Sequence, residues 1–150
     1  MDCQKSQNRH EISINTTNKE EAFRQILLWG EASWWPKKSS MKFTRIGRGP
    51  IVQGTLYRQK VMLPFAPSWC SVVTNINQGV STSRKLFEGF LDGQEEIKIV
   101  QGNNSLSAVY CLEYSIPNFV YRWLWKIFFE SLHNYNIELI LNNLKGYLEQ

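Results

Sequence analysis

The sequence predicts an α+β fold in which an antiparallel sheet of about seven strands packs against one long C-terminal helix. Three observations support this: a strand and then a helix near the N-terminus, a series of strand-like segments between residues 41 and 114, and a helical stretch without proline over residues 118–149. A single helix of that length is unstable alone in water, so it must pack across the sheet. At 150 residues the chain has the size of one domain.

The N-terminal part of this domain begins with a strand. Residues 10–15 alternate between polar and apolar side chains, as a half-buried strand does. The preceding residues are polar and show no such pattern. We therefore expect residues 1–8 to form a flexible tail and residues 9–150 to form the single domain.

One or two short helices should follow this first strand. Thr17 and Glu20 match the capping box that begins a helix, and apolar residues recur at helical spacing over 22–29. Gly30 then stands where a helix commonly ends. A bend is expected at residues 34–36, Trp-Trp-Pro, because the residue before proline is disfavoured in helical geometry.

The middle of the chain is a succession of short runs rich in β-branched and aromatic residues. We expect six strands here, at residues 41–46, 55–63, 69–76, 83–91, 95–100 and 106–114. Short connections containing Pro, Gly and Asn separate them, which is typical of antiparallel neighbours. Asp92-Gly93 predicts a type I′ hairpin turn. Pro117 is expected at the first position of the long helix, where its missing N–H costs nothing.

The composition excludes disordered and fibrous classes of protein. Hydrophobic residues make up 43% and charged residues 20%, while the aromatic fraction of 13% indicates that a wide space is filled or lined. The N-terminal residues are polar, unlike a secretory signal, and Arg122 and Lys126 interrupt the most apolar segment, which is too short to span a membrane. The cysteines show no metal-ligand spacing. We therefore expect a cytoplasmic protein with no metal and no cofactor.

The positive charge is concentrated in one part of the chain. The net charge is +4, yet residues 32–87 contain nine Lys and Arg residues and no acidic residue. The simplest interpretation is a solvated outer face of the sheet. The functional alternative is contact with an anionic membrane surface or an acidic partner. Nucleic acid is not expected, because no recognised binding motif accompanies the charge.

Four segments resemble the motifs of one superfamily. They are Glu20-Glu21-Ala22-Phe23 with Trp34-Trp35-Pro36, Gly54-Thr55, Glu88-Gly89-Phe90-Leu91-Asp92-Gly93, and residues 141–149. In this order they resemble the START-related superfamily, also labelled SRPBCC, and most closely its polyketide cyclase/dehydrase-like branch. The resemblance implies a helix-grip fold, in which a curved antiparallel sheet wraps around the C-terminal helix with an elongated apolar cavity between them. Relatives use this cavity for lipids, polyketides, hormones or quinones.

The apolar face of the long helix changes side near residues 134–136. One stripe carries Ile137, Leu141, Leu144 and Leu148. The same stripe continued backwards carries Lys126, Glu130 and His133. Two arrangements remain open. Either the helix over-rotates there and leaves these three side chains in solvent, or it stays straight and points them into the cavity. In the second case His133 beside Glu130 is a candidate general acid or base.

Alternation along the strands and the straight-helix arrangement together select candidates for the cavity wall. The predicted lining consists of Tyr57, Val61, Trp69, Tyr110, Leu112, Tyr114, Trp123, Lys126 and Ile137. Its tyrosines can orient a ligand carbonyl or hydroxyl, or alternatively only fill the core with their rings. Glu88 alternates with Leu86 and Phe90, so it is either a buried carboxylate with a raised pKa, and a third catalytic candidate, or a solvent-facing one.

These observations predict a protein that binds or transports a hydrophobic small molecule, such as a lipid, isoprenoid or polyketide-like compound, between sheet and helix. The alternative is a polyketide cyclase/dehydratase-like enzyme that works without a metal. A third class is a protein- or membrane-interaction module that uses the basic sheet face, and a homodimer is left open. Binding ranks above catalysis because the sequence shows no complete catalytic constellation.

Overall fold

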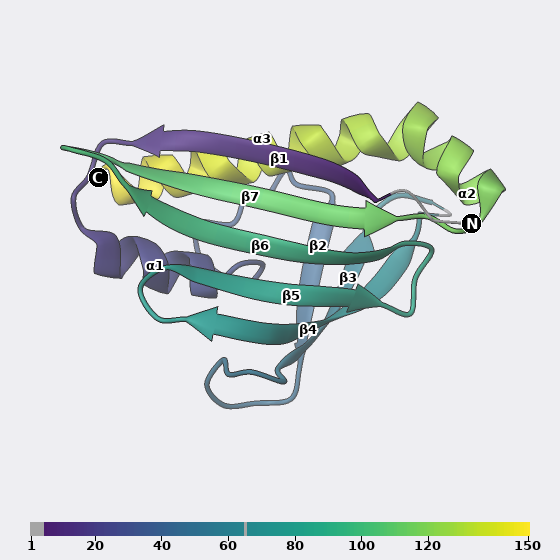
Figure 1. The fold of residues 1–150 in the computed structure, drawn as a ribbon, viewed down its shortest axis with the longest axis horizontal. Helices are drawn as coiled ribbons and strands as arrows, with labels where there is room; N and C mark the ends of the chain where they lie inside the picture. The colour runs from purple at the N-terminus through teal and green to yellow at the C-terminus, as the bar shows by residue number, and fades with distance from the viewer. Residues whose placement is uncertain (1–4, 65) are drawn as a thin grey trace.

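The computed structural model describes residues 5–64 and 66–150 and confirms the α+β fold (Figure 1). One sheet has the strand order β1-β7-β6-β5-β4-β3-β2, and all neighbouring strands in it are antiparallel. The strands are β1 (Ser6–Ile14), β2 (Met41–Ile46), β3 (Leu56–Val61), β4 (Ser68–Asn77), β5 (Ser81–Phe87), β6 (Asp92–Gln101) and β7 (Leu106–Ser115). The helical elements are α1 (Lys19–Leu27), α2 (Phe119–Leu124), the π-helical turn η1 (Trp125–Phe129) and α3 (Glu130–Leu148).

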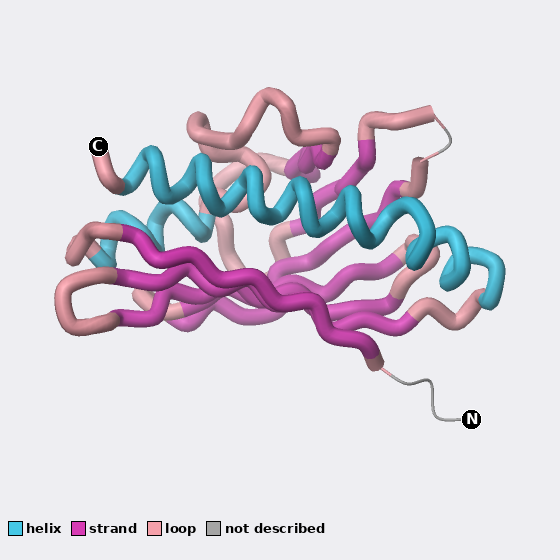
Figure 2. The backbone as a smooth tube through the Cα atoms, turned by 90° about the horizontal axis from the view of Figure 1, so that it is seen from above, coloured by secondary structure: helices cyan, strands magenta, loops and turns pink. Residues whose placement is uncertain are grey.

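The helices α1 and α3 pack on one face of the sheet. Figure 2 shows α3 crossing the sheet along most of its length. Its apolar stripe faces the strands, since Ile137, Ile140 and Leu144 are fully buried. Trp29, just after α1, is also fully buried, and its ring stacks on Tyr110 of β7 with 5.8 Å between centroids. The core therefore lies between the sheet and both helices. No helix in the described part of the chain is long and apolar enough to cross a membrane.

The first strand begins earlier than predicted. Ser6, Gln7 and Asn8 pair with β7, so they belong to the sheet and not to the tail expected over residues 1–8. Their backbone groups find partners in β7, whatever the polarity of their side chains. Residues 1–4 of that expected tail lie outside the described residues.

The connection between β5 and β6 also differs from the prediction. The prediction of a turn at Asp92-Gly93 is wrong, because β6 already begins at Asp92 and residues 88–91 form the connection. Within it Glu88 has a φ of 54°, in the left-handed region. Gly93 has a different role: a Cβ atom there would lie 2.8 Å from the backbone oxygen of Glu113 on β7. The glycine therefore permits close strand pairing.

Asparagine side chains cap the N-terminal ends of α1 and α2. The Asn18 side chain accepts a hydrogen bond from the Glu21 N–H at 3.1 Å, which replaces the predicted Thr17–Glu20 capping box. Asn118 accepts from the N–H groups of two residues in the first turn of α2, at 2.9 and 3.2 Å. Pro117 precedes this cap and is not the first helical residue as predicted. Asparagine is among the best N-cap residues, so each helix begins after it.

The π-helical turn η1 decides which faces of the long helix point inward. Such a turn contains about one more residue than an α-helical turn. The side chains of α2 are therefore rotated by about 100° from the directions that they would have in a regular α-helical continuation of α3. The sequence analysis considered an over-rotation near residues 134–136, whereas the structure has an underwound turn at residues 125–129. Neither predicted arrangement is fully correct: Lys126 is exposed, Glu130 is half-buried and His133 is only 7% exposed.

Candidate functional site

A groove of about 740 Å³ lies beside α2 and η1. Figure 1 shows α2 at the end of the sheet, beyond the strands. Three segments form its walls: the β3–β4 loop, the β5–β6 connection and the helical residues 121–129. The lining is mainly apolar and includes Pro67, Phe90, Tyr121, Leu124, Phe128 and Phe129. Glu88 and Ser68 contribute polar groups. The groove therefore offers an apolar surface with a few polar contacts, as small-molecule sites commonly do.

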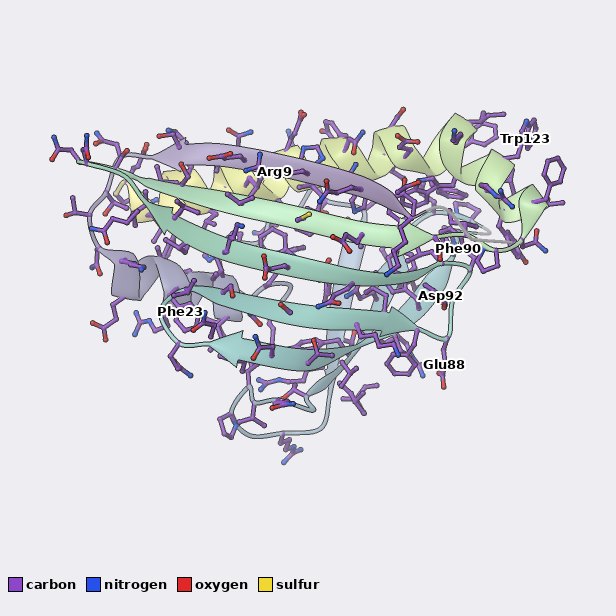
Figure 3. The ribbon with its side chains drawn as sticks, viewed as in Figure 1. Arg9, Phe23, Glu88, Phe90, Asp92 and Trp123 are labelled. Carbon is purple, nitrogen blue, oxygen red and sulfur yellow. The ribbon has the colours of Figure 1, made fainter. Side chains whose placement is uncertain are left out.

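Phe90 is the aromatic centre of this groove. Its ring lies 6.0 Å from Trp69, 5.7 Å from Trp125 and 6.0 Å from Tyr121, measured between centroids. Figure 3 shows Phe90 at the end of the sheet, near the α2 end of the long helix. One side chain thus connects β4, the β5–β6 connection and the helix.

The groove continues inward as a much smaller gap. A space of about 20 Å³ between sheet and helix is lined by Val61, Trp69, Trp125, Phe129 and His133, among others. Phe129 and Pro67 line both this gap and the groove. The elongated interior cavity implied by the resemblance is therefore filled here by large side chains. Most of the open volume in this part of the molecule lies at the end of the sheet.

Beyond the gap, three buried polar residues form a hydrogen-bonded chain. Tyr110 on β7 donates its hydroxyl hydrogen to Glu95 Oε2 on β6 at 2.9 Å. The same hydroxyl lies 3.2 Å from His133 Nε2 on α3. The pairing of β6 with β7 explains the contact: Tyr110 is opposite Ile97, and Glu95, two residues before Ile97, is on the same face. We call Glu95, Tyr110 and His133 the relay.

The relay determines the tautomer of His133. An ionised Glu95 can only accept, so with Glu95 ionised the single hydrogen of the Tyr110 hydroxyl goes to the carboxylate. His133 Nε2 must therefore carry its own hydrogen and donate it to the Tyr110 oxygen. His133 Nδ1 is then a bare lone pair, and it is buried with no hydrogen-bond partner among the described residues. The neutral imidazole is thus an unused hydrogen-bond acceptor and a potential base.

Burial controls the ionisation of the relay. It lowers the pKa of His133 to about 4, so the imidazole is neutral at neutral pH. Burial also raises the pKa of the Glu95 carboxyl, and the nearby Arg84 together with the Tyr110 hydrogen bond oppose this rise. The pKa of the Tyr110 hydroxyl is raised well above its ordinary value, first by burial and then by Glu95. Perturbed groups gathered around a gap are a common feature of functional sites.

Arg84 is a fully buried cation beside the relay. It is the β5 residue directly opposite Glu95. Its Nη2 donates to the backbone oxygen of Trp29 at 3.0 Å, and its guanidinium lies 4.2 Å from the Tyr57 ring centroid. Cation–π contact and the facing carboxylate both stabilise a charge that is costly to bury.

The structure brings several predicted residues together and separates others. Val61, Trp69 and His133 line the inner gap, and Tyr110 is in the relay. The buried side chains of Leu112, Tyr114 and Ile137 pack in the surrounding core. Tyr57 is fully buried on the same face of β3 as Val61, but its hydroxyl donates to Glu31 Oε1 at 2.7 Å, near α1.

The prediction of the cavity lining is wrong for two residues. Trp123 is 56% exposed and Lys126 is also exposed, because the π-helical turn places both on the outer side of the helix. Figure 3 shows Trp123 pointing away from the sheet. Glu88 is exposed at the groove and accepts from the Cys70 thiol at 3.7 Å, which matches the solvent-facing alternative. Glu130, half-buried at the start of α3, is not part of the relay.

The residues that the prediction missed are Arg84 and Glu95. Arg84 was counted in the basic segment, although it alternates in register with the buried Leu86. Glu95 likewise alternates with the buried Ile97 and Ile99. Alternation could therefore have indicated both. Four other basic residues are exposed on the outer sheet face, as the simplest interpretation predicted: Lys42, Arg58, Lys60 and Lys85.

The overall geometry matches solved structures over almost the whole chain. A protein from Thermus thermophilus superposes with a TM-score of 0.72 at 16% identity, covering 95% of this chain and 97% of that one. The chain has the helix-grip fold. Norcoclaurine synthase from Thalictrum flavum matches this helix-grip chain with a TM-score of 0.70 at 14% identity, covering 96% of this chain and 86% of the other.

A third helix-grip structure, an aromatase/cyclase from a Streptomyces species, has a TM-score of 0.70 at 13% identity over 97% of this chain and 94% of that chain. No protein-family model and no curated protein sequence matches the chain. The structural matches confirm the fold that the START-related resemblance implies. Identities this low are evidence of fold alone, so function must be argued from the site.

Proposed function

We propose that this protein binds a hydrophobic small molecule, of the lipid, isoprenoid or polyketide-like class, in the groove between the sheet and the α2–η1 segment. The groove itself is the observation that carries this proposal. Its volume of about 740 Å³ is within the range of small-molecule sites, and its lining is mainly apolar. Norcoclaurine synthase, which has the same fold, was solved in complex with dopamine and hydroxybenzaldehyde.

The inner end of the groove favours one kind of polar group on the ligand. His133 lines the inner gap, and the relay leaves its Nδ1 as a buried acceptor. A hydroxyl group can donate to Nδ1, whereas a carboxylate or phosphate presents only acceptors. We therefore expect a mainly apolar ligand with a hydroxyl group. Reaching His133 requires the gap between Trp69 and Trp125 to widen.

The binding proposal is tested with the neutral fluorescent probe N-phenyl-1-naphthylamine and with native mass spectrometry of freshly purified protein. The Phe90→Ala variant should weaken probe binding by about tenfold, because it removes an aromatic contact surface. Tyr135→Ala is the matched control, since Tyr135 is exposed on α3 and does not line the groove. Equal probe affinity in Phe90→Ala and the wild type would contradict the groove as the binding site.

The relay favours a second candidate function, a metal-independent cyclase or dehydratase. His133 Nδ1 would remove a proton from the carbon next to a ligand carbonyl, and Tyr110 and Glu95 would stabilise the resulting imidazolium through Nε2. The enolate carbon would then form a bond to a second carbonyl carbon of the ligand, whose oxygen takes the proton back from the imidazolium. Loss of this hydroxyl together with a second hydrogen from the attacking carbon would release water. The match to an aromatase/cyclase structure supports the same class. The test incubates the protein with a linear triketide thioester and follows water loss by mass spectrometry. Turnover that survives in His133→Gln would overturn this role, and probe binding without turnover would leave the binding function alone.

A further inference from the structure

The surface next to the groove is unusually apolar. Six large hydrophobic side chains of α2 and η1 are between 47% and 75% exposed: Phe119, Val120, Tyr121, Trp123, Ile127 and Phe128. We call these residues the tip. A soluble monomer rarely exposes a contiguous apolar patch of this kind unless the patch contacts something.

The fold itself creates the tip. No residue of α2 is buried, and Figures 1 and 2 show α2 extending beyond the end of the sheet. The π-helical turn directs Trp125 into the core, where its Nε1 donates to the Tyr114 hydroxyl at 2.9 Å. The same rotation leaves Trp123, Ile127 and Phe128 on the outside. The exposure is therefore built into the helix geometry.

The charge of the tip identifies the kind of surface it contacts. Arg122 and Lys126 lie exposed among the aromatic residues, and no acidic residue occurs between Glu113 and Glu130. Aromatic and aliphatic side chains interleaved with cations are typical of segments that lie in the headgroup region of an anionic bilayer.

We infer that the tip docks this protein on an anionic lipid bilayer, with its apolar side chains inserted at the headgroup–acyl boundary. Tyr121 and Phe128 belong both to the tip and to the groove lining. The docked protein would therefore hold the mouth of the groove against the lipid surface. Membrane docking uses the exposed tip, whereas ligand binding uses the groove. Docking can therefore be tested without any ligand.

A second copy of the chain is a poorer occupant of the tip. In a two-fold dimer the same patch faces itself, so Arg122 and Lys126 of one copy would approach those of the other. No acidic residue occurs between Glu113 and Glu130 to offset this repulsion, and the exposed Glu88 belongs to the other wall of the groove, on the β5–β6 connection. An anionic membrane instead supplies apolar contact and opposite charge at once.

The test measures sedimentation of the protein with vesicles of phosphatidylcholine and phosphatidylserine. A double variant, Trp123→Ser with Phe119→Ser, should lower the partition coefficient about a hundredfold, at about tenfold for each aromatic side chain. Neither residue lines the groove, so binding of N-phenyl-1-naphthylamine should be retained. Tyr135→Ser is the matched control, since Tyr135 is 57% exposed on α3 but lies outside the tip.

Two further measurements make the result specific. Trp123 is the most exposed of the described tryptophans, so vesicle binding should shift the fluorescence to shorter wavelength, and Trp123→Phe should bind without that shift. Arg122→Gln and Lys126→Gln should each weaken binding to anionic vesicles about fivefold, while Lys37→Gln, outside the tip, should not. No sedimentation at low salt, equal sedimentation of the double variant, or a dimer that forms through Trp123 without lipid would overturn the inference.

Discussion

Acidification should destabilise this protein through His133, and substituting that residue should remove the effect. Burial lowers the pKa of His133 from 6.5 to about 4. Above pH 6.5 the imidazole is neutral in both the folded and the unfolded state. As the pH falls from 6.5 to about 4, the unfolded chain binds a proton that the folded chain does not, and stability declines. The difference between the two pKa values corresponds to about 3 kcal/mol of unfolding free energy, at about 1.36 kcal/mol per pH unit.

The assay is urea unfolding of the wild type and of His133→Gln over this pH range. Glutamine keeps an N–H group that can donate to Tyr110 but has no group that titrates. The raised pKa of Glu95 acts in the opposite direction, since it stabilises the folded state on acidification, but it is present in both proteins. The difference between wild type and variant therefore isolates His133.

Parallel stability curves for the two proteins down to about pH 4 would refute this reasoning. So would a His133 imidazole that titrates near 6.5 by NMR. The chain contains two histidines, so the His10→Gln variant assigns both resonances. That variant keeps His133, and because His10 also contributes to lowering the pKa of His133, that pKa should rise slightly while the loss of stability on acidification remains.

Three further substitutions test the core and the backbone. Arg84→Met should cost about 3 kcal/mol in urea unfolding because it leaves the Glu95 carboxyl buried without its cation, whereas Lys85→Met, at the exposed neighbouring position, should stay within about 0.5 kcal/mol. Gly30→Ala should lower the unfolding free energy by about 2–4 kcal/mol, because Gly30 has a φ of +94° and an added Cβ would lie 2.5 Å from a Phe43 ring carbon. Gly146→Ala in α3 should raise it by about 1 kcal/mol, since nothing lies within 4 Å of the new methyl group. Thermal unfolding that changes in the same direction for both glycine variants would contradict this account.

The order of elements could be predicted from the sequence because its signals are local. Alternation over two residues, helical periodicity and turn residues indicated one strand, one helix, several strands and one long helix, and each element is present. The START-related resemblance added how they pack, which periodicity alone does not contain.

The relay could not be predicted in the same way because it depends on strand register. Glu95 meets Tyr110 only through the pairing of β6 with β7, and Arg84 meets Glu95 only through the pairing of β5 with β6. A shift of one residue in either pairing would turn these side chains outward. The position of the π-helical turn likewise could not be predicted from the spacing of apolar residues. It depends on how Trp125 packs against Tyr114 and Phe90.

The extra residue in η1 sets the direction in which α2 presents its side chains. If residues 125–129 took regular α geometry at unchanged chain length, α2 would rotate by about 100° about its axis. Trp123 would turn towards the sheet, while α3 and all the strands kept their places. Loss of the π-helical turn alone would therefore convert part of the aromatic tip into additional core. In this segment the helix geometry, more than the composition, decides which side chains are exposed to solvent.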